Sequence, residues 1–117
     1  MTAGGRLTTH VLDVARGRPA AGVGVELFAV VGGARDLLAA AETDADGRTE
    51  LVAGEPLRAQ TYEIAFTVSP YLAGAGLAEE PPFLDVVPVR FTIADAGRDH
   101  HVPLLLTPWS YTVYRGS

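Results

Sequence analysis

The chain has 117 residues, a formal net charge of −5, no cysteine and no lysine. Its length suits a single domain over residues 1–117, and its acidic balance argues against a nucleic-acid partner. The lack of cysteine and lysine excludes disulfides, thiolate chemistry and Schiff-base catalysis. No apolar run approaches the ~20 residues of a membrane helix, and residues 1–6 do not resemble a secretory signal. We therefore expect a cytoplasmic protein with no membrane partner.

Alternating apolar residues predict β-structure through most of the chain. Three rows carry an apolar side chain at every second position, at residues 23–31, 62–68 and 87–93. Turn signals rich in glycine separate these rows, at residues 17–19, 32–33, 46–47, 54–56 and 95–97. Short strands separated by such turns are typical of an all-β, antiparallel sandwich or barrel.

One segment after the second row departs from this pattern. Ser69 can cap a helix, Pro70 suits its first position, and Gly76 follows its end. We therefore predict one short helix between Ser69 and Gly76.

A strand predicted at residues 102–106 is apolar on both faces. Val102, Leu104 and Leu106 share one face, and Leu105 lies on the other with Pro103. One face can join the core, and the other needs cover, so we expect self-association. Proline is uncommon inside strands, which places Pro103 at an edge or irregularity.

Three histidines are the first candidates for chemistry. His10 shares a strand face with Thr8, and taken alone it is better explained as a half-buried structural residue. His100 and His101 are adjacent and point to opposite faces, so only one of them can serve a given site. Three histidines are enough for a zinc site in principle. Their spacing does not favour one, and we expect no metal.

Two further features stand out in the sequence. Arg48 follows Asp46 and Gly47, a dipeptide typical of hairpin turns, although a solvated arginine after a turn is common. The sequence closes on Tyr, Arg, Gly and Ser at residues 114–117, a polar and aromatic strand end. Taken alone, each feature is better explained as an ordinary turn or strand end, and only together with the histidines do Arg48, Tyr114 and Ser117 become candidates for a site.

These motifs together resemble the signatures of the 5-hydroxyisourate hydrolases, the transthyretin-like enzymes of urate breakdown. The matching stretches are LTTHVLD at 7–13, the DADGR turn at 44–48, HVPLL at 101–105 and YRGS at 114–117. The resemblance spans the whole chain. It implies a transthyretin-like antiparallel β-sandwich of two sheets with one short helix.

The resemblance also implies an activity. Such enzymes open the six-membered ring of 5-hydroxyisourate by hydrolysis, which gives 2-oxo-4-hydroxy-4-carboxy-5-ureidoimidazoline, with no metal or cofactor. By resemblance, His10 and His101 form an acid/base pair, and Arg48 binds substrate and the developing oxyanion. Ser117 orients substrate or water through its hydroxyl or carboxylate, and Tyr114 is a further substrate-binding candidate. The family forms a homotetramer, a dimer of dimers, with sites where the dimers meet.

One departure from the family pattern concerns the residues before His101. The family usually has His-Tyr-His there, and this chain has Asp99, His100 and His101. Asp99 shares a face with His101 and either raises the pKa of that histidine or is inert. A carrier like transthyretin, or a prealbumin-like structural module, is the alternative interpretation of the same fold.

Overall fold

The computed structural model describes residues 4–76 and 79–116 of the chain. Within these residues lie nine strands and one helix, which in chain order are β1 (Leu7–Asp13), β2 (Arg18–Pro19), β3 (Gly24–Val31), β4 (Ala34–Glu42), β5 (Arg48–Glu50), β6 (Thr61–Thr67), α1 (Ser69–Ala75), β7 (Val86–Thr92), β8 (His100–Leu106) and β9 (Tyr111–Val113). A helix of seven residues is far too short to cross a bilayer, and the described part of the chain holds no longer one.

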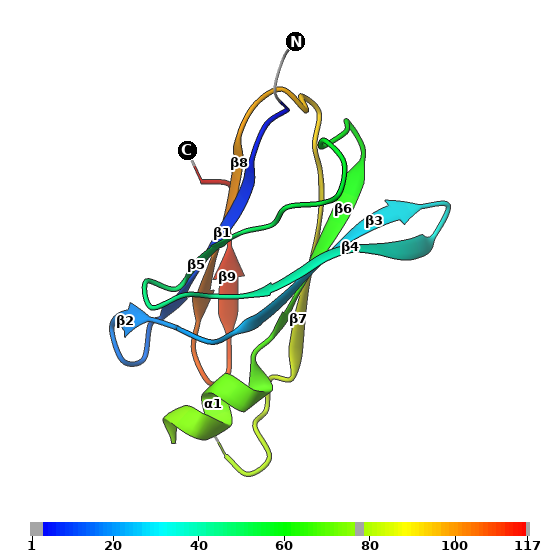
Figure 1. The fold of residues 1–117 in the computed structure, drawn as a ribbon. Coiled ribbons are helices and arrows are strands. Elements are labelled where there is room, and N and C mark those ends of the chain that lie inside the picture. The colour runs from blue at the N-terminus through cyan, green and yellow to red at the C-terminus, as the bar shows by residue number, and fades with distance from the viewer. Residues whose placement is uncertain (1–3, 77–78, 117) are drawn as a thin grey trace.

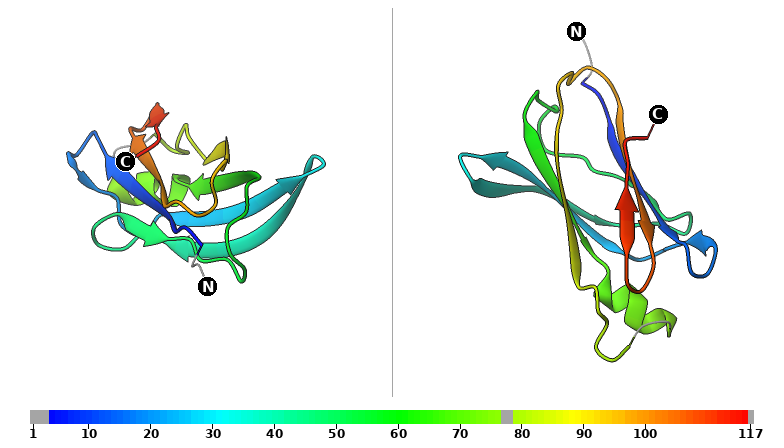
Figure 2. Two further views of the ribbon diagram at one scale, coloured as in Figure 1. Left: turned by 90° about the horizontal axis from the view of Figure 1, so that it is seen from above. Right: turned by 180° about the vertical axis from the view of Figure 1, so that it is seen from behind.

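Two sheets face each other, and α1 lies at one end of the molecule (Figure 1). One sheet has the order β4-β3-β6-β7, and the other has the order β2-β1-β8-β9, with β5 also paired to β1. The β3–β4 hairpin extends to one side, away from the second sheet (Figure 2). Every strand pair is antiparallel except β1 with β8, which is parallel. The predicted sandwich with one helix is confirmed, and the parallel pair was not predicted.

The core lies between the sheets and follows the predicted alternation. In β3, Val25 and Leu27 are buried, and the residues between them lie on the outer face. Val31, the last apolar residue of the row at 23–31, is instead 60% exposed because β3 ends there at the hairpin turn. The largest fully buried side chains are Tyr62, Phe66, Leu7, Leu27, Ile64, Leu72, Ile93, Leu104, Leu106, Val11, Val23 and Val25.

The short helix α1 begins one residue earlier than the sequence predicts. Val68 occupies the N-cap, and no side chain caps the helix. The Ser69 hydroxyl, expected to cap, donates instead to Asp85 Oδ1 at 2.8 Å. Pro70 lies in the first turn, and Gly76 ends the helix in the left-handed conformation, with φ 69°. The predicted cap is therefore wrong, and the predicted end is confirmed.

Strand β8 lies inside its sheet, between β1 and β9. Val102, Leu104 and Leu106 are buried on the face toward the core. His101 and Leu105 lie on the outer face and are partly buried. The strand is thus apolar on both faces, as the sequence predicts.

Pro103 lies inside β8, where its register with β1 is unbroken and its Cα partner is His10. The irregularity predicted for this proline is found on the side of β9. Regular pairing with β9 stops at Leu104 and resumes only as a bridge between His101 and Gly116. Proline has no N–H to donate, which agrees with a gap in the ladder at this point.

Candidate functional site

Strands β5, β1 and β8 lie side by side, and their outer face carries three of the predicted site residues. Arg48 in β5 is the Cα partner of His10 in β1. Thr8, two residues before His10, is the Cα partner of His101 in β8. Alternate residues of a strand share a face, and paired residues share it across strands. The register therefore brings His10, Arg48 and His101 onto one surface.

The turn before β5 fixes the backbone position of Arg48. Asp44 Oδ1 accepts hydrogen bonds from the backbone N–H groups of Asp46 and Arg48, at 2.9 and 3.0 Å. The N–H of Gly47 donates to the Asp44 carbonyl at 2.9 Å. The turn is confirmed, but the hairpin interpretation is wrong. Strand β4 pairs with β3 and β5 pairs with β1, so the turn carries the chain from one sheet to the other.

We expect Gly47→Ala to destabilise the fold and to push Arg48 away from His10. Gly47 has φ +73°, and a Cβ there would lie 2.5 Å from the carbonyl oxygen of Val11. Strain and clash together should lower the free energy of unfolding by about 3 kcal/mol, measured by urea denaturation. Gly32→Ala is the matched control, since Gly32 has φ +59° and a Cβ there meets no atom within 4 Å. Gly32→Ala should lower the free energy of unfolding by about 1 kcal/mol, and an equal loss in the two variants would contradict the clash at Gly47.

A groove of about 490 Å³ lies on this face, along the first residues of β1 and β8. Thr8, Arg48 and His101 line it, together with Arg6 and Glu50. A volume of this size suits a small organic ligand, and hydroxyl, guanidinium and imidazole groups can fix the orientation of a polar one. The site predicted from the sequence therefore borders a hollow that a small heterocycle can enter.

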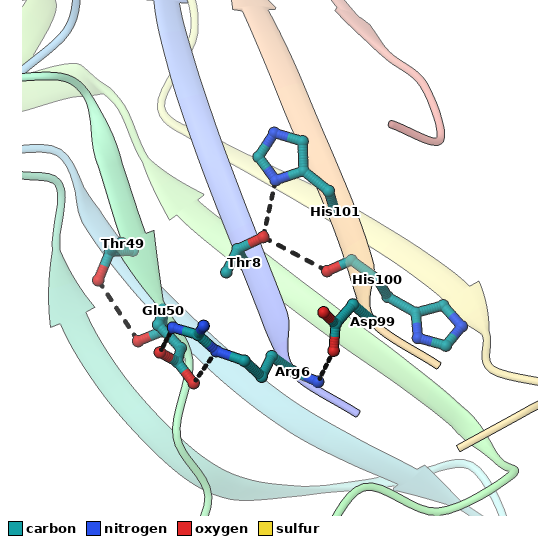
Figure 3. A network of polar contacts seen from close by, with 7 residues as sticks. All are labelled: Arg6, Thr8, Thr49, Glu50, Asp99, His100 and His101. Atoms are coloured by element: carbon teal, nitrogen blue, oxygen red, sulfur yellow. Dashed lines mark hydrogen bonds and ion pairs between the residues drawn. The ribbon is translucent and has the colours of Figure 1, made fainter. Parts of the chain in front are cut away.

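Arg6 neutralises the carboxylate on one wall of the groove (Figure 3). It donates to Glu50 through Nη2 at 2.6 Å and through Nε at 3.2 Å, and this contact holds the pKa of Glu50 below its usual value. Arg48 has no ion pair within residues 4–76 and 79–116. No carboxylate of the described chain therefore holds its guanidinium in an ion pair, and the guanidinium can act on a ligand.

Asp99 does not raise the pKa of His101. Its Oδ1 accepts the backbone N–H of Arg6 at 2.8 Å and so fastens the start of β1 (Figure 3). The pKa of His101 is lowered, first by burial and then by the charge of Arg48, and only the contact with Thr8 opposes this. Of the two expectations for Asp99, the electrostatic one is wrong and the residue has a structural role.

The pKa of His10 is lowered as well. Burial is the largest cause, followed by the charge of Arg48 and then by His101, while Asp44 and Asp46 oppose the shift weakly. Both histidines thus have a pKa below the ordinary value of 6.5. At pH 7 both rings are neutral, and a neutral imidazole can accept a proton.

The remaining candidates are placed differently. The side chain of His100 is on the opposite face from that of His101, since its Cα partner is the buried Leu7. His100 borders the groove and also a second hollow of about 440 Å³, which His101 borders too, and its Nδ1 is buried without a hydrogen-bond partner among the described residues. Tyr114 is 52% exposed and borders this second hollow rather than the groove beside Arg48. Ser117 lies outside the described residues.

Comparison with known proteins places this arrangement in a family. The model of the HIUase/Transthyretin family matches residues 7–116. The chain belongs to this family. The 5-hydroxyisourate hydrolase of Deinococcus radiodurans is 53% identical to it over 113 residues, which cover 95% of each chain.

Solved structures agree with membership of the HIUase/Transthyretin family. The 5-hydroxyisourate hydrolase of Klebsiella pneumoniae has a TM-score of 0.80 and 32% identity, over 97% of this chain and 99% of that one. Sea bream transthyretin, solved with thyroxine, has a TM-score of 0.84 and 29% identity, over 94% of this chain and 93% of that one. The resemblance of the motifs and the transthyretin-like sandwich are both confirmed.

Two contacts of His101 in this member of the HIUase/Transthyretin family were not predicted from the sequence. The Thr8 hydroxyl lies 2.8 Å from His101 Nδ1. Gly116 packs on the same ring, and a Cβ at Gly116 would lie 2.6 Å from His101 Cδ2. The sequence offered two signals for these contacts. Thr8 lies on the same strand face as His10, and a glycine stands in the closing tetrapeptide. Neither signal indicates a partner until the parallel register of β1 and β8 is known.

No three His, Cys, Asp or Glu side chains are grouped to hold a metal ion within the two described ranges. The groove is lined by the Arg48 guanidinium, the His101 imidazole and the Thr8 hydroxyl, together with Arg6, Asp44, Glu50 and Asp99. The His10 imidazole lies on the same face, opposite Arg48 in the strand pair. This set can transfer protons and stabilise negative charge on oxygen.

Proposed function

We propose that this chain hydrolyses 5-hydroxyisourate, opening its six-membered ring to 2-oxo-4-hydroxy-4-carboxy-5-ureidoimidazoline in urate breakdown. The observation that carries the proposal is the meeting of His10, Arg48 and His101 on one face, from three strands, beside the groove. The 53% identity to a 5-hydroxyisourate hydrolase supports it. A carrier or a structural module is not favoured, because neither needs two neutral histidines beside an arginine that has no ion pair among the described residues.

The two histidines supply the proton transfers. Water must lose a proton as its oxygen attacks the ring carbonyl, and a neutral imidazole of His10 or His101 accepts that proton. The pKa of each is lowered, so the accepting form is present at pH 7. An imidazolium then donates a proton to the ring nitrogen as its bond to the carbonyl carbon breaks. The product leaves as a carboxylate, and its proton passes to solvent.

Arg48 stabilises the charge that forms on the carbonyl oxygen during attack. Its guanidinium keeps its charge at any working pH and offers two parallel N–H groups to a planar, oxygen-rich ring. A positive group fixed in place before the reaction is usually the largest contribution to such a step. In the same proposal, Ser117 orients substrate or water and Tyr114 contacts substrate, both on the strength of the motif that they share with the family.

We also propose the assembly and location of the protein. The chain forms a homotetramer, a dimer of dimers, with the sites at the interface between dimers, and acts in the cytoplasm as one domain. The outer face of β8 supports this assembly. Leu105 and His101 are only partly buried there, so a partner covering this face would bury the rest of Leu105 and close the groove from water.

The product identifies the reaction. We expect ¹³C NMR of freshly generated 5-hydroxyisourate, mixed with the protein, to show rapid loss of the ring carbonyl and growth of one carboxylate signal. The product should be the same compound that slow spontaneous hydrolysis gives. Unchanged substrate signals, or signals that shift in proportion to protein without a new carboxylate, would mean binding without hydrolysis and would support the carrier.

We expect the catalytic rate to fall on the acid side of neutrality. A lowered pKa means that each histidine is neutral at pH 7 and gains a proton only below 6.5. The rate should therefore be constant near pH 7 to 8 and decline as pH falls through those pKa values. NMR titration of the three histidine rings should give values below 6.5 for His10 and His101. Arg48→Gln should raise both, and a pKa of His101 above 6.5 in the unaltered protein would contradict the site electrostatics.

A further inference from the structure

The hydroxyl of Thr8 is in contact with the ring of His101 (Figure 3). Thr8 Oγ1 lies 2.8 Å from Nδ1 of His101 and 3.5 Å from the carbonyl oxygen of His100. The other ring nitrogen, Nε2, lies on the side of the ring away from Thr8 (Figure 3). The protein thus treats the two nitrogens of His101 differently, since Nδ1 is occupied by Thr8 and Nε2 is not.

One arrangement of hydrogens satisfies both contacts of Thr8 Oγ1 at once. A threonine hydroxyl has one hydrogen to donate and can also accept, whereas a backbone carbonyl only accepts. When the Thr8 hydroxyl donates to the carbonyl of His100, its oxygen accepts the Nδ1–H of His101. Nε2 then carries the lone pair. We propose that Thr8 is a positioning residue that holds His101 in this tautomer and makes Nε2 the atom that takes the proton from water, a role that rests on the proposed hydrolysis.

This arrangement suits a proton acceptor because nothing has to rotate during the reaction. When Nε2 gains a proton, Nδ1 keeps its hydrogen and keeps donating to Thr8. In the reverse arrangement, the Thr8 hydroxyl donates its hydrogen to Nδ1. When the ring then became an imidazolium, Nδ1 would carry a hydrogen of its own that points at the hydroxyl hydrogen, and the hydroxyl would have to turn. Groups that are already oriented for the charged state contribute most to catalysis. Threonine is suited to this because its branched Cβ restricts χ1.

Gly116 limits the ring from another side. Its N–H donates to the His101 carbonyl at 2.8 Å, and a Cβ at this position would lie 2.6 Å from Cδ2 of the ring. The imidazole is therefore placed by Thr8 at Nδ1 and by the Gly116 backbone at Cδ2. The fixed ring orientation keeps Nε2 in one place.

The other histidine of the site is not held in this way. The His10 ring has no hydrogen bond to another side chain or to the backbone among the described residues. His10 is two residues from Thr8 on the same face, so it shares the site without sharing the contact. This difference assigns the proton acceptor to His101, and the imidazolium so formed is the group that later donates the proton to the ring nitrogen, with His10 beside it on the same face.

The test compares Thr8→Val, which keeps the shape and removes the hydroxyl, with Thr8→Ser, which keeps the hydroxyl. The ¹⁵N chemical shifts of the His101 ring, measured in ¹⁵N-histidine-labelled protein, report which nitrogen carries hydrogen. In the unaltered protein and in Thr8→Ser, we expect Nδ1 to be protonated and Nε2 to be bare. In Thr8→Val we expect a mixture of tautomers and a kcat about tenfold lower, with KM changed less than about twofold.

Several results would overturn the role of Thr8. One is an Nε2–H tautomer in the unaltered protein, which needs no variant and so does not depend on whether Thr8→Val folds. Another is a folded Thr8→Val protein with the original tautomer and the original kcat. Failure of the proposed function is a separate result, because a protein without hydrolase activity would still show the tautomer by NMR.

Discussion

Replacing His101 with Asn is expected to lower kcat/KM for 5-hydroxyisourate by about a thousandfold. Asparagine keeps much of the side chain's length and can still contact Thr8, but its amide cannot accept a proton at neutral pH. Water must then attack without a base, while Arg48 continues to bind the carbonyl oxygen. The loss should appear mainly in kcat, since His101 acts on the attacking water and contributes little to substrate affinity.

His100→Asn is the matched control for this substitution. The two histidines are adjacent in β8, and their side chains lie on opposite faces of the sheet. The control should keep kcat/KM close to that of the unaltered protein, and circular dichroism should show both variants folded. Equal losses of kcat/KM in the two variants would mean that disturbance of β8, rather than loss of the His101 imidazole, lowers the activity.

Arg48→Lys is expected to lower kcat/KM by at least about a hundredfold although the charge is kept. A lysine ammonium is a single point of charge on a flexible chain and cannot offer two parallel N–H groups to a planar ligand. Its ammonium would also hold its own water more strongly than a guanidinium does. Initial rates at several substrate concentrations would separate the effects on kcat and KM.

Arg18→Lys serves as the comparison for Arg48→Lys. Arg18 is an exposed arginine of β2 in the same sheet, and it does not border the groove. This change should leave the rate unaltered, which shows that loss of an arginine as such has no effect. A folded Arg48→Lys protein with a near-original rate would exclude the proposed two-point contact and leave only a requirement for positive charge.

Much of the fold could be predicted because the strands of a sandwich show themselves as local patterns. The row at 23–31 alternates so regularly that its buried face follows from the sequence alone. The row at 62–68 was predicted in the same way, but β6 is buried on both faces, with Glu63 and Ala65 covered as well. The helix was also visible, since Pro70 and Gly76 mark its start and end. The pairing of β1 with β8 could not be predicted, because the two strands are far apart in the sequence and local alternation does not define their register.

The site divides in the same way. His10, Arg48 and His101 could be named from their motifs, but only the register of β5, β1 and β8 puts them on one face. Thr8 escaped notice because a threonine in a strand is ordinary, and its role depends on the residue opposite. Asp99 was overrated for the opposite reason: its shared face with His101 suggested an interaction, yet its carboxylate is engaged by the backbone N–H of Arg6.

The most direct test of the proposed function is the number of 5-hydroxyisourate molecules that each protein molecule consumes. Freshly generated substrate is added in large excess over the protein, and its ultraviolet absorbance is followed beside a buffer control. We predict a decay many times faster than the control that continues until the substrate is exhausted, with a rate proportional to protein concentration. A brief change in absorbance that stops at one equivalent, followed by decay at the background rate, would contradict hydrolysis and identify a binding protein.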